Sequence, residues 1–167
     1  EGSAAGDDGL VIAADSSVIR GLSVFNFPGN DLVEIRRGSG SLVEGCFLGV
    51  DTDGVTIKTN SGAAVRITGA LTSGNTIGGT TPAARNVLSG EGYGIYVTGS
   101  GSNVIQGNFI GTDAGGTQAR GNYYMGIQLA PASNTLVGGT APGARNVLSG
   151  NGQQYAYRAS GLYISGG

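Results

Sequence analysis

The stretch NTIGGTTPAARNVLSG at residues 75–90 decides the fold, because it returns in closely similar form as NTLVGGTAPGARNVLSG at residues 134–150. The two copies begin 59 residues apart (134 − 75), at Asn75 and Asn134. Self-similarity at a fixed period is the signature of stacked repeats, in which each repeat contacts only its neighbours. The spacing is too long for one coil of short strands and suits two, so we predict a stack of coils.

The composition agrees with one folded unit. Glycine accounts for 34 and proline for 4 of the 167 residues, a share that would suggest disorder in a chain without a repeat. Hydrophobic residues make up 39% and charged residues 12%, which supplies a core and too little charge for a self-repelling chain. We predict a single domain over residues 1–167, and expect it to be part of a longer repeat protein because neither terminal coil has a polar cap.

Charge and residue types exclude several classes of function. The chain has 9 basic and 11 acidic residues and no cluster of Lys or Arg that could neutralise successive phosphates, so nucleic acid is not an expected partner. No apolar run approaches 18 residues, so we expect no membrane insertion. The chain has no histidine and one cysteine, Cys46, which excludes Cys/His zinc sites and Ser-His-Asp triads. Any catalysis would use carboxylates, Arg, Lys or Tyr.

Turn signals divide the chain into coils of similar composition. Each coil carries three short apolar runs separated by turn residues, the pattern expected of three strands per turn of a helix of parallel strands. No long window shows the i, i+3, i+4, i+7 spacing of an amphipathic helix. The coils are predicted to begin near Ser17, Ser41, Asn75, Asn103 and Asn134, after a partial first coil.

Three inward stacks of aliphatic residues follow from the alternation of side chains along a strand. In the third run of each coil the inward pairs are Leu10/Ile12, Val33/Ile35, Val65/Ile67, Ile95/Val97, Ile127/Leu129 and Leu162/Ile164, and the outward residues between them are Val11, Glu34, Arg66, Tyr96, Gln128 and Tyr163. The first run adds Ile19, Val43, Ile77, Ile105 and Leu136, and the second adds Val24, Leu48, Leu88, Ile110 and Leu148. Burying each such side chain is worth roughly 1.5 to 3 kcal/mol, so these stacks are the predicted core.

One column of residues directly precedes the second run of each coil, and three of its five members are asparagines. Its members are Leu22, Cys46, Asn86, Asn108 and Asn146. Stacked asparagine amides can hydrogen-bond along the axis and satisfy backbone groups of the turns, so we interpret the three asparagines as a structural corner. Cys46 then fits as a small buried thiol, and a reactive role for it is the alternative.

The repeats at residues 103–113 (NVIQGNFIGTD) and 138–152 (GGTAPGARNVLSGNG) resemble those of bacterial right-handed parallel β-helix proteins, whose fold is shared with pectate lyases and polygalacturonases. The resemblance implies an all-β, right-handed, single-stranded parallel β-helix (β-solenoid) of about five to six coils with three short strands each. It also implies a secreted or cell-surface location. It does not select an activity, because the same fold carries lyases, hydrolases, epimerases, adhesins and inert stalks.

An acidic edge is predicted five residues past the asparagine corner. The alignment places Asp51, Glu91, Asp113 and Asn151 in one column, with Asp53 beside Asp51. On rungs about 4.8 Å apart, these groups could bind calcium, act as the acid and base of a glycosidase, form the metal site of a polysaccharide lyase, or serve as solvated turn residues. Enzymes of this fold combine such acids with a catalytic Arg, Lys or His, and no stretch here matches them residue by residue. Calcium is the one cofactor left open.

A contact surface is predicted on the outward column of the third run. Glu34 and Arg66 lie one rung apart as an expected exposed ion pair, Tyr96 follows Arg66, and Tyr163 ends the column. Further tyrosines, Tyr123, Tyr124, Tyr155 and Tyr157, lie on loops. Together they could contact a glycan or a protein, and the alternative is that the loop tyrosines only pack their own loops.

Four apolar residues of the second run face outward and need a cover. They are Phe47, Val87, Phe109 and Val147, and the nearest candidate covers are residues 112–120 and 153–160 or a partner.

These patterns favour a structural or adhesive β-solenoid module of a secreted or cell-surface protein. It would contact polysaccharide through the outward column and neighbouring coils or subunits through its uncapped ends. The alternative is a fragment of a carbohydrate-active enzyme, a polysaccharide lyase or glycoside hydrolase, that uses the acidic edge.

Overall fold

The computed structural model describes residues 7–152 and 160–166, and in them almost all regular structure is β-strand. One turn of 3-10 helix, η1 (Pro82–Ala84), interrupts a loop, with Thr81 as its N-cap. The strands are short because glycine and asparagine turns end each one after two to six residues. Every strand therefore depends on its neighbours in the stack for stability.

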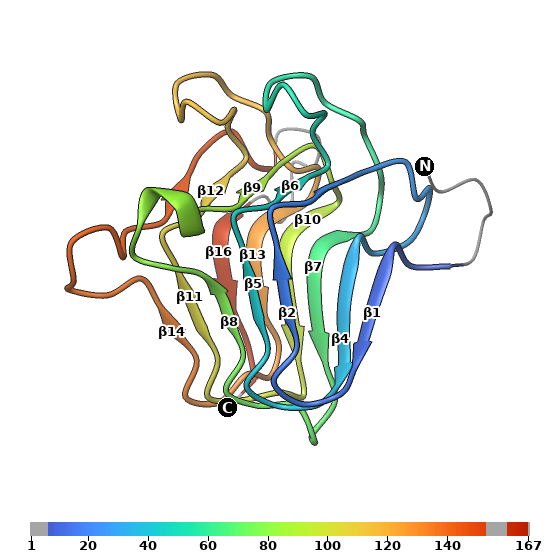
Figure 1. The fold of residues 1–167 in the computed structure, drawn as a ribbon, viewed down its shortest axis with the longest axis vertical. Helices are drawn as coiled ribbons and strands as arrows, with labels where there is room; N and C mark the ends of the chain where they lie inside the picture. The colour runs from blue at the N-terminus through green and yellow to red at the C-terminus, as the bar shows by residue number, and fades with distance from the viewer. Residues whose placement is uncertain (1–6, 153–159, 167) are drawn as a thin grey trace.

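The strands form three parallel sheets, in each of which strands of successive coils lie side by side (Figure 1). Sheet A contains, in spatial order, β1 (Leu10–Ala13), β4 (Val33–Arg37), β7 (Ala63–Thr68), β10 (Tyr93–Thr98), β13 (Met125–Leu129) and β16 (Ser160–Ile164). Sheet B contains β14 (Leu136–Val137), β11 (Val104–Gln106), β8 (Thr76–Gly78), β5 (Leu42–Glu44) and β2 (Val18–Arg20). Sheet C contains β15 (Val147–Leu148), β12 (Phe109–Ile110), β9 (Val87–Leu88), β6 (Phe47–Leu48) and β3 (Ser23–Val24). Successive strands along the chain go to different sheets, which confirms the predicted parallel β-helix of about five to six coils.

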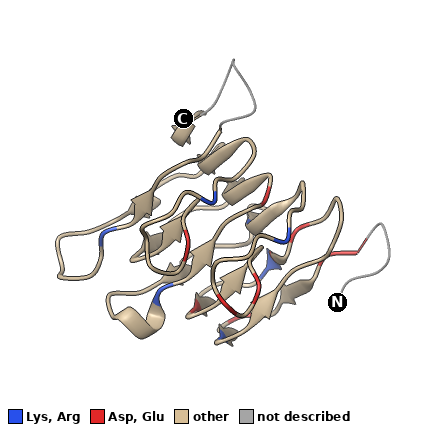
Figure 2. Ribbon diagram, turned by 90° about the horizontal axis from the view of Figure 1, so that it is seen from above, with Lys and Arg blue, Asp and Glu red and all other residues tan. Residues whose placement is uncertain are grey.

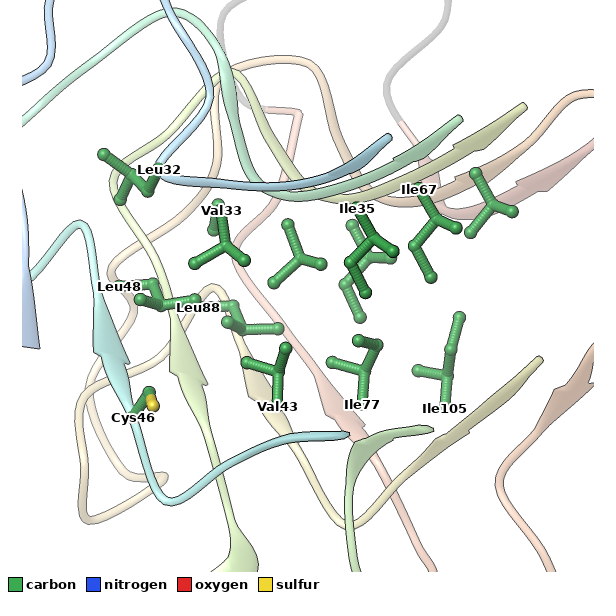
Figure 3. Close-up of a cluster of buried hydrophobic side chains, with 14 of the residues drawn as sticks. Leu32, Val33, Ile35, Val43, Cys46, Leu48, Ile67, Ile77, Leu88 and Ile105 are labelled. Atoms are coloured by element: carbon green, nitrogen blue, oxygen red, sulfur yellow. The ribbon is translucent and has the colours of Figure 1, made fainter. Parts of the chain in front are cut away.

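The register of sheet A is the one predicted from the sequence. One inward column pairs Leu10 with Val33, Val33 with Val65, Val65 with Ile95, Ile95 with Ile127 and Ile127 with Leu162. The three sheets close around one hydrophobic core, in which Ile35, Val43 and Leu48 come from sheets A, B and C and are fully buried (Figure 3). Alternation along the strands and stacking between coils thus create the core.

One predicted core residue is placed wrongly by the sequence alignment. Ile105 pairs with Val137, whereas Leu136 pairs with Val104 and is 51% exposed. The second copy of the repeat has one residue more before its glycine pair, and a shift of one residue turns a strand's side chains to the other face. Val137, not Leu136, therefore continues the inward stack of sheet B.

Two hairpin loops cover the outward phenylalanines of sheet C. Residues 50–57 and 112–119 are closed by the antiparallel bridges of Val50 with Ile57 and of Thr112 with Ala119. A Cβ at Gly54 would lie 3.1 Å from the Phe47 ring, and one at Gly116 would lie 2.8 Å from the Phe109 ring, so each loop folds back over its own phenylalanine. The predicted cover by residues 112–120 is thus present over Phe109, whereas the cover of Phe47 by residues 50–57 was not predicted. The predicted cover by residues 153–160 lies almost wholly outside the described residues.

Candidate functional site

The asparagine corner is a continuous ladder of side-chain amides between sheets B and C. Asn86 Nδ2 donates to Asn108 Oδ1 (2.9 Å), and Asn108 Nδ2 donates to Asn146 Oδ1 (3.1 Å). The same amides serve the backbone of the preceding strands, as Asn108 Nδ2 does with the carbonyl of Ile77 (2.9 Å). The column extends to Cys46, whose backbone N–H donates to Asn86 Oδ1 (2.9 Å). The side-chain amides of the ladder are therefore engaged in hydrogen bonds within the fold.

Cys46 is a buried free thiol at the end of this ladder. Burial raises the pKa of the Cys46 thiol, and the nearby charge of Glu44 adds to the rise, while backbone groups of Leu22 and Gly21 oppose it. Thiolate is the reactive form of cysteine. The environment of Cys46 thus favours the unreactive thiol.

The predicted acidic edge divides into two separate sets of residues. Glu91 shares a column with Asn122 and Asn151, because its backbone N–H donates to Asn122 Oδ1 (3.0 Å) and the N–H of Asn122 donates to Asn151 Oδ1 (3.1 Å). Asp51 and Asp113 instead lie at equivalent positions of the two hairpin loops. The alignment missed this because it counted residues from the asparagine corner without allowing for the hairpins.

The aspartates of the hairpin loops are held by their own loops. Asp51 Oδ1 accepts from the N–H of Thr52 (2.7 Å) and its other oxygen pairs with Lys58 (3.2 Å). Asp53 Oδ1 accepts from the N–H groups of Val55 and Thr56, both at 2.8 Å. Among residues 7–152 and 160–166, no three Asp, Glu, Cys or His side chains are grouped so as to hold a metal ion. Calcium binding at this edge stays a prediction.

Hydrogen bonding lowers the pKa of these loop aspartates. The hydroxyl and N–H of Thr56, with the N–H of Val55, lower the pKa of Asp53 to about 2. Backbone N–H groups of Gln118 and Thr117 likewise lower the pKa of Asp113. Both groups are therefore charged at neutral pH and act as turn-stabilising acceptors.

Glu91 is the exception among the acids, because its side chain is fully buried and neither carboxyl oxygen has a hydrogen-bond partner within the described chain. In the next two coils the column holds amides, and these donate to the strand below: Asn122 Nδ2 to the Leu88 carbonyl and Asn151 Nδ2 to the Ile110 carbonyl, both at 2.9 Å. The Glu91 carboxyl takes the same place and lies against Gly49, where a Cβ would be 2.6 Å from Oε1. A protonated acid can replace an amide donor there, and a carboxylate cannot.

Burial raises the pKa of Glu91 to about 8, and the charge of Asp31 adds to the rise while the Asn60 amide opposes it. Loss of water around the carboxylate is the largest cause of this rise in pKa. No cation is among the groups that act on the Glu91 carboxyl to stabilise its charged form. The Glu91 carboxyl is therefore protonated at neutral pH. Unlike the loop aspartates, it is a neutral acid inside the fold.

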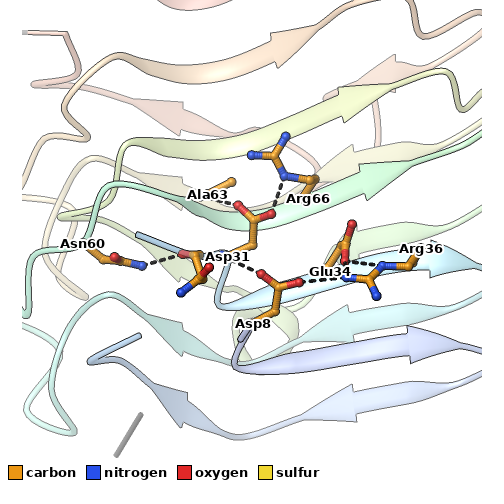
Figure 4. A network of polar contacts seen from close by, with 8 residues as sticks. Asp8, Asp31, Glu34, Arg36, Asn60, Ala63 and Arg66 are labelled. Carbon is orange, nitrogen blue, oxygen red and sulfur yellow. Dashed lines mark hydrogen bonds and ion pairs between the residues drawn. The ribbon is translucent and has the colours of Figure 1, made fainter. Parts of the chain in front are cut away.

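A network of ion pairs lies on the outer face of sheet A near the first coils (Figure 4). Arg66 Nε pairs with Asp31, and Arg36 pairs with both Glu34 and Asp8. The predicted exposed pair between Glu34 and Arg66 is wrong, although the two are register neighbours. Arg66 turns instead to Asp31, on the segment that enters β4, and Glu34 is buried beneath Arg36.

A strip of tyrosine rings continues this face. Arg66 stacks on Tyr96 (4.6 Å from guanidinium carbon to ring centroid), Tyr96 on Tyr93 (5.4 Å), and Tyr93 on Tyr124 (5.1 Å). Tyr123 meets Tyr124 edge to face at 4.9 Å. These residues, Arg66, Tyr96, Tyr93, Tyr124 and Tyr123, are called the aromatic strip below. All four rings are half-buried, so part of each remains open to a ligand.

The structure unites four of the predicted contact residues, Arg66, Tyr96, Tyr123 and Tyr124, and adds Tyr93, which the sequence analysis missed. Tyr163 pairs with Gln128, two rungs from Tyr96, and takes no part in the described ring contacts. Tyr93 was missed because strict alternation turns it inward. Gly94 instead faces the core, where a Cβ would lie 2.5 Å from Ile110, and this leaves Tyr93 outside. Tyr155 and Tyr157 lie outside the described residues.

Two adjoining cavities lie on the segments that lead from the strands of sheet C to those of sheet A. One, of about 270 Å³, includes Thr59, Glu91, Arg120 and Tyr123 in its lining. The other, of about 430 Å³, includes Thr59, Asn60, Tyr123 and Tyr124. Because Thr59 and Tyr123 line both, the cavities form one groove that leads to the aromatic strip. The groove is called the strip groove below.

No family model, curated protein or solved structure matches this chain. None of the described residues belongs to a helix long and apolar enough to cross a membrane. The evidence for a parallel β-helix is therefore the arrangement of the three sheets. The evidence for a candidate site is the set of contacts in the aromatic strip and the lining of the strip groove.

Proposed function

We propose that this parallel β-helix is a binding module of a secreted or cell-surface protein, and that it holds a glycan against the aromatic strip. The observation that carries the proposal is the continuous row of contacts from Arg66 through Tyr96, Tyr93 and Tyr124 to Tyr123, which begins on sheet A and ends on the loop before β13. Tyrosine offers an apolar ring face and a polar hydroxyl on a side chain with few rotatable bonds. Sugars present C–H faces and hydroxyls together, so the two surfaces are complementary.

Rigidity supports a binding role. The strip residues Arg66, Tyr93 and Tyr96 stand on the central strands β7 and β10, which are paired on both sides. A site on strands is held more firmly than one on loops, so a ligand loses less free energy to ordering of the protein. The half-buried rings are therefore arranged before any ligand arrives.

We infer from the repeats at residues 103–113 and 138–152 that the chain belongs with the pectate-lyase-like parallel β-helices of extracellular proteins. We also propose that further coils or other subunits contact the two ends of the stack. In the last strand, β16, the inward-facing Leu162 and Ile164 are 40% and 66% exposed, because no further described coil covers them. Apolar residues on unpaired strand edges favour pairing with another strand.

The test is affinity electrophoresis of the chain through gels that contain neutral or acidic polysaccharides. Tyr96→Ala removes the ring between Arg66 and Tyr93, and we expect it to weaken binding by about tenfold or more, or about 1.4 kcal/mol. Tyr163→Ala is the matched control, because Tyr163 lies in the same outward column and outside the strip. Equal losses in the two variants, or no loss in Tyr96→Ala, would contradict the proposal.

Glu91 supports a second candidate, a carbohydrate-active enzyme. A neutral acid beside a sugar-sized groove is a candidate proton donor for cleavage of a glycosidic bond. We rank this second because the Glu91 oxygens are closed to solvent, so a substrate would reach them only after the corner opens. New reducing or unsaturated ends that disappear in Glu91→Gln would establish the enzyme, and binding without products would favour the module.

A further inference from the structure

The strip groove and the aromatic strip form one extended path across the molecule. The groove passes from Arg120 over Thr59 and Tyr123 to Tyr124, and Tyr124 contacts Tyr93 of the strip. Successive ring centroids along the strip are 4.9 to 5.4 Å apart. A path of this form suits a linear chain of several sugars better than one small molecule.

The groove offers mainly uncharged polar groups. Thr59 and Ser61 bring two hydroxyls to its lining, beside the phenols of Tyr123 and Tyr124. The amide of Asn60 is buried and engaged with the Gly29 and Ser61 N–H groups and the Asn30 carbonyl. Hydroxyls both donate and accept hydrogen bonds, as the hydroxyls of a sugar require. This chemistry fits an uncharged carbohydrate.

Arg120 brings the one charge that the described lining carries at neutral pH, since Glu91 is protonated there. Its guanidinium is already held by oxygen acceptors: Nε donates to the Val55 carbonyl (2.7 Å), Nη1 to the Ala119 carbonyl (2.9 Å) and Nη2 to Gln118 Oε1 (2.8 Å). Arg120 thereby ties one hairpin loop to the other. It is placed to hold the loops rather than to pair with a carboxylate of a ligand.

At the far end of the path, carboxylates outnumber cations. The ion-pair network beside Tyr96 contains three carboxylates, Asp8, Asp31 and Glu34, and two guanidiniums, Arg36 and Arg66. Figure 2 shows acidic segments in the first coils and none near the C-terminal end. The carboxylates are 9 to 14% exposed and the guanidiniums that cover them are 26 and 55% exposed, so both cations are already paired within the network. A polyanionic chain that reached the strip would therefore find no unpaired guanidinium in this network and one carboxylate in excess, which disfavours it.

We propose that the strip groove and the aromatic strip together bind a linear, uncharged polysaccharide and discriminate against polyuronates. This inference rests on the proposed glycan-binding function and adds the class of glycan. Uncharged sugars would pack against the open parts of the strip and exchange hydrogen bonds with the groove, whereas the carboxylates of a uronate chain would lose water without gaining an unpaired guanidinium.

Calorimetry tests the inference with cellohexaose, xylohexaose and mannohexaose as neutral probes and hexagalacturonate as the acidic probe. We expect at least one neutral probe to bind at least tenfold more tightly than hexagalacturonate, with the gap widening at low salt. Thr59→Trp should abolish neutral binding, because it fills the junction of the two cavities from an exposed position. Leu71→Trp is the control, since Leu71 is 83% exposed and lines neither cavity.

The outcomes separate this inference from the proposed function. Equal or tighter binding of hexagalacturonate, or unchanged neutral binding in Thr59→Trp, would overturn the inference and leave the glycan module standing if Tyr96→Ala still weakens binding. If Thr59→Trp changes the thermal unfolding of the protein, Tyr123→Ala takes its place as the test variant. We expect Tyr123→Ala to weaken the binding of neutral probes at least tenfold. Binding of none of the probes, neutral or acidic, would overturn both.

Discussion

Replacing Glu91 with glutamine should remove a large pH dependence from the stability of this fold. In the unfolded chain the carboxyl has the ordinary pKa of 4.5, and in the folded chain burial raises it to about 8. Between these values the folded protein holds a proton that the unfolded chain releases, so the free energy of unfolding falls as the pH rises. The difference of about 3.5 units corresponds to about 5 kcal/mol at most, because each unit is worth 1.36 kcal/mol. Water entering the corner would make the effect smaller.

The sign of the effect is specific to a buried neutral acid. Below pH 4.5 both states are protonated and Glu91 costs nothing electrostatically. Above about pH 8 both states are ionised and the full penalty is present. Glutamine provides a side-chain amide N–H donor like those of the neighbouring Asn122 and Asn151, and its side chain does not ionise in this pH range. Glu91→Gln should therefore match the parent protein near pH 4 and exceed it by several kcal/mol near pH 8.

Urea unfolding followed by far-UV circular dichroism at pH 4, 6 and 8 measures this difference. Comparing the variant with the parent at each pH cancels the contributions of the other acids. Glu44→Gln is the matched control, because Glu44 pairs with the exposed Arg20 and a pair of that kind is worth under about 1 kcal/mol. A stability difference between Glu91→Gln and the parent that stays constant with pH, or shrinks toward pH 8, would refute the reasoning.

Three further predictions follow from single positions. Ile127→Asp should abolish the cooperative thermal transition, because it puts a charge into the fully buried core, while Gln128→Asp on the outer face of the same strand should melt like the parent. Asn108→Ala should lower the free energy of unfolding in urea by about 2 to 3 kcal/mol, because it leaves buried ladder partners unsatisfied; a loss no greater than that of Asn30→Ala, on an exposed turn, would contradict this. The Asp53 carboxyl should titrate near pH 2 by NMR, so its contribution to stability is present above its ordinary pKa of 3.8 and is lost as the pH falls through about 2; titration near 3.8 would show that the Thr56 bonds do not persist.

The register of the stack could be predicted residue by residue, as the column from Leu10 to Leu162 shows. Alternation in a strand and repetition between coils are both local rules, so a sequence with a clear period is enough to apply them. The same rules misplace Leu136, where one inserted residue changes the face of a two-residue strand. They also misplace Tyr93, where a glycine at the corner faces the core in place of the tyrosine.

The sequence by itself therefore determined the parallel β-helix, its three inward stacks and its asparagine corner. Only the tertiary structure decided which polar groups meet on the surface: that Arg66 turns from Glu34 to Asp31, that Glu91 joins an amide column, and that four tyrosines form one strip. The physical reason is the unequal length of the loops. The third coil passes from β9 to β10 within four residues, so the hairpin loops of its two neighbours meet above it, with the Ala114 N–H donating to the Gly54 carbonyl at 2.9 Å. Contacts between loops of different coils carry no period, and no local pattern in the chain announces them.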